Sequence, residues 1–258
     1  MDHVVFKTYR AKLKRLIKDF PVIWSIYRQY TERKIGVKYR NKGIEEVFTT
    51  INTENLWNNR ESISGPGSTH FVTNYLVTAL PGLLNKYDIR SILDAPCGDF
   101  HWMQMVDLSN VNYMGADIVE QLIIANNNTY GARNISFIYS DITKDTLPPV
   151  DLIIVRDCLV HFNDNQIFDF FCNLCRSEIS FLLTTNFPLT KHNYNITCGN
   201  WRPINLMRKP YSLPKEIDIL WEKCEENRGQ YPDKSLYLWK VNDLKPYIKY
   251  QTKDGSQS

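Results

Sequence analysis

The stretch Ser91-Ile-Leu-Asp-Ala-Pro-Cys-Gly-Asp99 places a short apolar run before an acid and a tight turn. The apolar run predicts a buried strand, and Gly98 predicts a turn where the missing side chain lets a ligand approach the backbone. In an open parallel sheet, ligands bind outside the carboxyl ends of the strands, where the strand order reverses. The stretch therefore predicts an α/β fold and a binding site at the end of this strand.

Short apolar runs alternate with helical patterns on both sides of this stretch. A helix is expected over residues 69–84, capped by Ser68 or Thr69, and another over 164–176. The expected strands cover residues 91–94, 113–117, 136–139, 151–155, 180–185, 217–221 and 235–241, with the last two as an antiparallel pair that closes the sheet. This alternation predicts a doubly wound, mostly parallel, seven-stranded sheet covered by helices on both faces.

The chain divides into three parts by pattern and charge. Residues 1–45 are expected to form a basic amphipathic helical extension, residues 46–245 the main domain, and residues 246–258 a flexible tail. Twelve Lys and Arg but only three Asp and Glu fall within residues 1–43, although the whole chain has a net charge of only +3. The main domain is therefore mildly acidic, which argues against nucleic acid as its partner.

The basic extension has two interpretations. Apolar residues recur at helical spacing from residue 4 to residue 30, and Pro21 interrupts the pattern. The extension can be a helical cap with a solvated basic face, or residues 1–30 can make peripheral contact with an anionic membrane surface. Composition alone does not separate the two, and the cap is the favoured one.

Cysteine and histidine usage bears on compartment and metal. Six cysteines in 258 residues are too sparse for a disulfide scaffold, so we expect a cytoplasmic protein, membrane-peripheral at most. The pair Cys172-x-x-Cys175 lies in an expected helix and has no second ligand pair at zinc spacing. His3, His70 and His192 show no ligand spacing with carboxylates, and His101 is a secondary candidate for the catalytic base, with a structural role as the favoured interpretation. No metal site is therefore expected.

Acids end the next two expected strands as well. Asp117 follows Gly98 by nineteen residues, which is a suitable reach for a carboxylate that accepts hydrogen bonds from ribose hydroxyls. In Ser140-Asp141-Ile142 the acid can accept from an exocyclic amine while Ile142 packs on a purine. The first turn lacks Gly-x-Gly-x-x-Gly, and its two acids, Asp94 and Asp99, would repel a pyrophosphate but suit a cationic ligand.

These residues resemble the class I S-adenosylmethionine-dependent methyltransferases over roughly residues 60–242. Asp94 to Gly98 is similar to the first motif of that family, Asp117 to its ribose-binding acid and residues 140–142 to its adenine-edge position, although Pro96-Cys97 departs from the usual small residues. The stretch from Arg156 to His161 is similar to its fourth motif. The resemblance implies S-adenosylmethionine as cofactor, held by Asp94, Ala95, Cys97, Gly98, Asp99, Asp117, Ile118, Ser140, Asp141, Ile142 and Arg156.

A narrower resemblance concerns the acceptor. Residues 61–68 (Glu-Ser-Ile-Ser-Gly-Pro-Gly-Ser) and Gly199-Asn-Trp-Arg-Pro-Ile-Asn-Leu206, together with the motifs above, resemble a bacterial group associated with surface-polysaccharide gene clusters. That resemblance implies O-methylation of a sugar hydroxyl on a nucleotide-linked sugar or a capsular polysaccharide precursor. The segments least like the common core are expected to bind the acceptor, through Glu61, Ser68, Asn186, Trp201 and Arg202.

A sugar hydroxyl needs a base to take its proton, and His161 is the expected base, with Asp157 orienting it or holding the substrate. The two residues lie four apart, hence on one face if the stretch is helical. Alternatively, His161 packs under the sheet edge and hydrogen-bonds a backbone carbonyl, and Trp201 fills a gap beneath a loop. Two other functions stay open, a lipid-linked or phosphorylated acceptor and a non-catalytic partner subunit that keeps the cofactor pocket.

Overall fold

The computed structural model describes residues 20–223 and 231–254. The chain forms two compact units, residues 1–41 and residues 42–258. In the first unit, helix α2 (Pro21–Tyr39) begins with proline at its first position, where the missing N–H has no helical partner to lose. The interruption expected at Pro21 is thus the start of a helix, while residues 1–19 of the expected amphipathic extension lie outside the described part of the chain.

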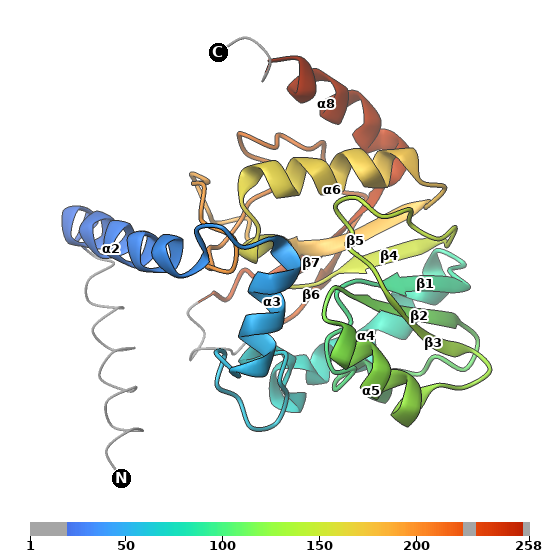
Figure 1. The fold of residues 1–258 in the computed structure, drawn as a ribbon. Helices are drawn as coiled ribbons and strands as arrows, with labels where there is room; N and C mark the ends of the chain where they lie inside the picture. Colours follow the sequence, from blue (N-terminus) through green and yellow to red (C-terminus); the bar gives the residue numbers. More distant parts are fainter. Residues whose placement is uncertain (1–19, 224–230, 255–258) are drawn as a thin grey trace. The chain divides into compact units, whose positions relative to one another are not determined.

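The second unit contains the seven-stranded sheet, in the order β3-β2-β1-β4-β5-β7-β6 (Figure 1). Neighbours among the first five strands pair in parallel, and β7 runs antiparallel between β5 and β6. The strands are β1 (Ser91–Asp94), β2 (Asn112–Asp117), β3 (Ile135–Tyr139), β4 (Leu152–Val155), β5 (Phe181–Asn186), β6 (Asp218–Trp221) and β7 (Ser235–Lys240). The expected doubly wound, mostly parallel sheet is confirmed, with strand ends displaced by one residue at most.

Helices cover both faces of the sheet. Figure 1 shows α6 (Asp164–Arg176) and α8 (Val241–Asp254) on one face, and α4 (His70–Lys86) and α5 (Glu120–Tyr130) on the other. The remaining elements are α3 (Ile44–Thr53) and three 3-10 turns, η1 (Pro66–Ser68), η2 (Met103–Met105) and η3 (Leu159–His161). No helix within the described ranges is long and apolar enough to cross a membrane.

Strand β4 shows why both faces must be covered. Its four residues have no solvent exposure. Ile153 and Val155 pack into the cluster under α6 and α8, whereas Leu152 and Ile154 pack into the cluster that includes α4. Because successive side chains of a strand point to opposite faces, a continuous apolar run belongs in the middle of a two-sided core.

The C-terminal residues differ from the expected flexible tail. Residues 246–254 continue helix α8, and residues 255–258 lie beyond the described part of the chain. Val241, Leu244 and Ile248 are at most 3% exposed and join the core cluster that also holds α6. Of these three residues only Ile248 lies in the expected tail, and its polar neighbours hid it in the sequence; the prediction of a flexible tail is wrong for residues 246–254.

The sheet topology fixes where a ligand can bind. From β1 the chain continues outward to β2 and then β3, and it then returns to place β4 on the other side of β1. The order therefore reverses between β1 and β4. In open α/β sheets the crevice at such a switch point, beyond the carboxyl strand ends, is the usual ligand site.

Candidate active site at the carboxyl edge of the sheet

Three carboxylates stand at the carboxyl ends of the first three strands. Asp94 ends β1, Asp117 ends β2, and Asp141 comes two residues after β3. All three are buried, with 3%, 6% and 2% exposure. Since the strands are parallel neighbours, their acids lie on the same edge of the sheet, as the sequence predicted.

The turn after β1 is tied directly to Asp117. The Gly98 N–H donates to Asp117 Oδ2 at 3.0 Å, and the side-chain amide of Asn126 donates to the Gly98 carbonyl at 2.8 Å. Gly98 has φ +55°, a region that side chains disfavour, and a Cβ there would lie 2.0 Å from Ser64 Oγ. Glycine is therefore required both by the backbone angle and by the close approach of the 61–68 loop.

Burial makes two of these acids unusually weak. It raises the pKa of Asp94 to about 7, although the Tyr113 hydroxyl at 2.7 Å and the charge of Arg156 oppose the rise. It also raises the pKa of Asp117 to about 6, against the hydrogen bonds from the backbone N–H groups of Val119 and Gly98. A cation or a hydrogen-bond donor at this edge would favour the ionised forms.

The third strand end offers a donor in need of a partner. Ser140 is 6% exposed, and its Oγ has no hydrogen-bond partner among the described residues. Asp141 accepts from the N–H and the hydroxyl of Thr143 and forms an ion pair with Lys144 at 3.2 Å. Ile142 is 6% exposed and belongs to the core cluster. Ser140 is thus one of the groups at this edge that lack a hydrogen-bond partner, as are Asn186 Nδ2 and Glu222 Oε1.

Asp99 also has a role that was not predicted from the sequence. Its carboxylate accepts from Ser62 Oγ at 3.0 Å, from the Ile63 N–H at 2.9 Å and from Ser64 Oγ at 2.9 Å. These three bonds fasten the 61–68 loop onto the turn after β1. Asp99 therefore holds the loop in place, and about one acceptor site of its carboxylate is left for the predicted contact with the cofactor, which stays a prediction.

Arg156 and Asp157, just beyond β4, belong to a buried network of four charges. Arg156 donates to Glu222 Oε2 at 2.8 Å and to the carbonyl of Gly67 at 2.9 Å. Lys234 donates to Asp157 Oδ2 and lies 3.4 Å from Glu222 Oε2. Burial raises the pKa of Asp157, but the charges of Lys234 and Arg156 outweigh that effect and lower it overall.

Asp157 does not orient His161. Its φ of +53° takes the chain out of helical geometry, so the two residues do not share a helix face. Its carboxylate faces Lys234 and Arg156, and its N–H donates to Thr185 Oγ1 at 2.8 Å. The predicted orienting contact is therefore wrong, although Asp157 remains at the carboxyl edge with a side chain that is 26% exposed.

His161 is held by a backbone carbonyl and by aromatic rings. Its Nδ1 lies 2.8 Å from the Asn200 carbonyl oxygen, so Nδ1 carries the proton of the neutral ring and Nε2 presents its lone pair. The ring lies 5.4 Å from that of Trp57 and 6.4 Å from that of Phe48. Burial lowers its pKa, against the hydrogen bond to Asn200 and the charge of Asp157, which raise it.

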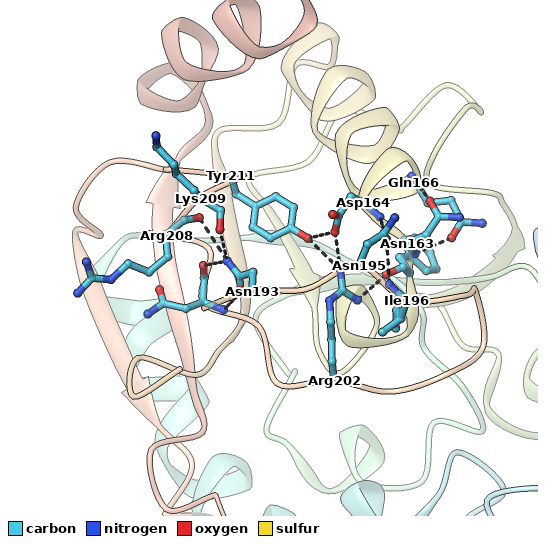
Figure 2. A network of polar contacts seen from close by, with 12 residues as sticks. Asn163, Asp164, Gln166, Asn193, Asn195, Ile196, Arg202, Arg208, Lys209 and Tyr211 are labelled. Carbon is cyan, nitrogen blue, oxygen red and sulfur yellow. Dashed lines mark hydrogen bonds and ion pairs between the residues drawn. The ribbon is translucent and has the colours of Figure 1, made fainter. Parts of the chain in front are cut away.

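Arg202 is structural. It has no solvent exposure and donates to the Phe162 carbonyl at 2.6 Å, to Asp164 Oδ1 at 2.9 Å and to the Tyr211 hydroxyl at 2.9 Å. Figure 2 shows this network between the 193–211 segment and the start of α6. The prediction that Arg202 binds the acceptor is therefore corrected, because a fully buried guanidinium has no face left for a ligand.

Asn186, Trp201 and Ser68 were also predicted to contact the acceptor. Asn186 is fully buried and its Oδ1 accepts from the Leu206 N–H at 2.8 Å, whereas its Nδ2 has no hydrogen-bond partner among the described residues, so its predicted contact with the acceptor stays a prediction. Trp201 packs against Phe187 and Tyr231 but keeps 36% of its surface exposed. Ser68 lies in η1, and its N–H donates to the Gly65 carbonyl. Because Trp201 packs against two rings and keeps part of its surface exposed, it fills the gap beneath the loop and still leaves surface for a ligand.

Three residues near the site, Lys234, Glu222 and Trp57, were not predicted from the sequence. Lys234 and Glu222 reach the carboxyl edge from the strand pair β6 and β7, far along the chain from Asp157. Trp57 stands beside His161, and a Cβ on Gly65 would lie 3.3 Å from it. No local pattern marks these residues, and Glu222 is the first charge of the stretch Glu222-Lys-Cys-Glu-Glu226, which does not single it out.

The edge fits a ligand with hydroxyls and a positive charge. Each Asp117 oxygen accepts one backbone N–H, at 2.9 and 3.0 Å, which leaves further acceptor capacity for hydroxyls. Asp94 is desolvated without a cation in direct contact among the described residues, and Ser140 Oγ lacks a partner. Asp94, Asp117 and Ser140 thus suit the adenosine, ammonium and sulfonium groups of S-adenosylmethionine.

Comparisons with known proteins agree with this fold. No family model and no curated protein matches the sequence. The N-methyltransferase NodS from Bradyrhizobium japonicum WM9, in complex with S-adenosyl-L-homocysteine, aligns with TM-score 0.54 and 16% identity over 74% of this chain and 97% of its own. Human N-acetylserotonin methyltransferase, in complex with SAM, aligns with TM-score 0.52 and 14% identity over 82% and 66%. The chain therefore has the α/β fold of the class I S-adenosylmethionine-dependent methyltransferases.

Proposed function

We propose that the chain is an S-adenosylmethionine-dependent methyltransferase that methylates a hydroxyl group. The observation that carries the proposal is the set of buried acids at the ends of β1, β2 and β3, next to the switch point of this fold. Asp117 would bind the ribose, Ser140 the adenine edge, and Asp94 the positively charged end. The bound cofactor supplies a methyl group already activated by a sulfonium charge.

The protein must then align the acceptor and take its proton. His161 is suited to this task because the Asn200 carbonyl fixes the tautomer and leaves Nε2 as the acceptor. Its lowered pKa keeps the ring neutral near neutral pH, as a base must be before it takes a proton. The hydrogen bond to a backbone carbonyl and the role as a base are thus compatible, because Nδ1 makes the hydrogen bond and Nε2 would take the proton.

We propose a sugar hydroxyl, on a nucleotide-linked sugar or a capsular polysaccharide precursor, as the acceptor. Three aromatic side chains support a flat, partly apolar ligand: Trp57 beside His161, the half-exposed Trp201 and the neighbouring Tyr231.

The direct test is incubation with methyl-labelled S-adenosylmethionine and a panel of nucleotide sugars, with masses recorded for the gain of one methyl group. We expect one member of the panel to gain a methyl and the other product to be S-adenosyl-L-homocysteine. Calorimetry with S-adenosyl-L-homocysteine tests the cofactor site separately. If that ligand gives no binding heat, the cofactor assignment fails whatever the acceptor is.

A second candidate acceptor is a lipid-linked or phosphorylated molecule. The observation that favours it is the excess of twelve Lys and Arg over three Asp and Glu in residues 1–43. Such a segment would bind an anionic membrane peripherally. Deletion of residues 1–43 should then abolish binding to vesicles that contain anionic lipid and leave S-adenosyl-L-homocysteine binding unchanged. A non-catalytic partner subunit would instead bind the cofactor and methylate no member of a broad panel.

A further inference from the structure

Glu61, His70 and His101 come together where the 61–68 loop, the start of α4 and the segment after β1 meet. One ligand atom from each of the three residues lies within 4.8 Å of the other two. The imidazole rings of His70 and His101 are in contact, with centroids 4.0 Å apart and planes tilted by 31°. Glu61 Oε1 lies 3.2 Å from His101 Nε2. Three separate segments of the chain thus bring two imidazoles and a carboxylate to one place.

The cluster keeps ligand atoms that are not used inside the chain. Glu61 Oε1 accepts from the His70 N–H at 2.6 Å, whereas Oε2 has no hydrogen bond among the described residues. The same holds for the ring nitrogens of His70 and for His101 Nδ1 within the described ranges. His101 has 18% of its side chain exposed and Glu61 has 42%, so an ion can enter from solvent. An ion pair between His101 and Glu61 alone does not explain why the ring of His70 also lies against that of His101.

The cluster is also held in place before any ion arrives. Asp99, two residues before His101, accepts three hydrogen bonds from residues 62–64, directly after Glu61. The carboxylate of Glu61 accepts from the first N–H of α4, which fixes His70 beside it. A site whose ligands are already positioned loses less entropy when it binds.

From this geometry we infer a binding site for a divalent transition metal of the Zn²⁺ type, formed by Glu61, His70 and His101. Two imidazoles and one carboxylate suit Zn²⁺, Co²⁺ or Ni²⁺ better than Mg²⁺ or Ca²⁺, which prefer oxygen ligands alone. Three protein ligands leave a coordination position for water. The metal would add a second link between the 61–68 loop and the segment after β1, in addition to the hydrogen bonds of Asp99, and this inference does not depend on the proposed methyl transfer.

The test measures metal binding by the full chain. Protein stripped with EDTA and dialysed is titrated with Zn²⁺ against a chromophoric chelator, and with Co²⁺ by its visible absorption. We expect one equivalent to bind, and we expect His70→Ala and His101→Ala each to weaken binding by at least about tenfold. Glu61→Gln keeps the acceptor for the His70 N–H but removes the charge, and should weaken binding as well.

Two control variants test whether other histidine or cysteine side chains account for the metal binding. His192→Ala removes an exposed histidine outside the cluster, and Cys172→Ser breaks the half-buried Cys172-x-x-Cys175 pair; both should bind as the unsubstituted chain does. Saturating Zn²⁺ should raise the melting temperature of the unsubstituted chain and not that of the double variant His70→Ala/His101→Ala. The inference is overturned if the chain binds no Zn²⁺, if the double variant binds as well as the parent, or if Cys172→Ser abolishes binding.

Discussion

Gly98→Ala tests the claim that two sequence motifs are locked together at the candidate cofactor site. The new methyl group would lie 2.0 Å from Ser64 Oγ and 3.0 Å from Ser64 Cβ, so Ser64 must move. Placing a side chain at φ +55° costs about 1–2 kcal/mol. Displacing the Ser64 hydroxyl from the Asp99 carboxylate costs about 2–3 kcal/mol more, because that hydrogen bond involves a charged group.

The free energy of unfolding should therefore fall by about 3–5 kcal/mol, measured by urea or thermal unfolding followed by circular dichroism. For a domain of this size the melting temperature would fall by roughly 6–20 °C. Gly82→Ala is the matched control. Gly82 lies inside α4 with no atom within 4 Å of an added Cβ, so alanine should stabilise by about 0.5–1 kcal/mol.

A double variant isolates the clash from the backbone strain. Ser64→Ala removes the oxygen at 2.0 Å, so Gly98→Ala should cost less in that background than in the parent chain. If Gly98→Ala changes stability no more than Gly82→Ala does, or if its cost is the same with and without the Ser64 hydroxyl, the reasoning about this junction is wrong.

Three further predictions follow from the candidate site. His161→Ala should lower kcat by about 10²–10⁴-fold and should also lower the melting temperature, because it leaves the Asn200 carbonyl without its donor; turnover equal to that of the parent at saturating acceptor would rule out a catalytic base. Because the pKa of Asp94 is about 7, its carboxylate is mostly protonated at about pH 6, and S-adenosyl-L-homocysteine should bind about tenfold more weakly there than at about pH 8; in calorimetry, Asp94→Asn should remove this part of the pH dependence and leave the smaller part due to Asp117, whose pKa is about 6. Arg202→Met should lower the free energy of unfolding by about 3 kcal/mol without raising the KM for the acceptor, since Arg202 contacts only the chain; a raised KM with unchanged stability would restore its predicted role.

The raised pKa values also set how stability depends on pH. Asp94 and Asp117 hold their protons more tightly in the folded chain than in the unfolded one. Their contribution to stability is therefore present in acid, below the unfolded pKa values, and is lost as pH rises through about 6–7. The same burial that weakens the fold near neutral pH prepares the edge for a cation, which would recover part of that free energy on binding.

Structural features that depend on residues close together in the chain could be predicted from the sequence. The four apolar residues of β4 and the capping box of Asn163 and Gln166 depend on neighbours one to four positions away, so the strand and the start of α6 were predictable. The acids at the ends of β1 and β2 were predictable for the same reason, since a strand that ends in an acid places it at the sheet edge.

Contacts between distant segments could not be predicted in this way. Asp99 and Arg202 both stand in stretches that resemble binding motifs, yet one holds residues 62–64 and the other holds the start of α6. An acid or a guanidinium looks the same in sequence whether its partner is a ligand or another part of the chain. Only burial and the count of hydrogen bonds already made separate the two cases.

Several motif residues around the site therefore hold loops in place and do not need a ligand as their partner. The residues 62–64 and Asp99 form one junction, and Arg202, Asp164 and Tyr211 form another, so both act by holding loops against the sheet. The groups left for a ligand are fewer: Asp94, Asp117 and Ser140 on one side, and His161 with its aromatic neighbours on the other. A substitution in either junction should therefore lower stability first and activity as a consequence, whereas a substitution among the remaining groups should lower binding or turnover in a chain that still folds.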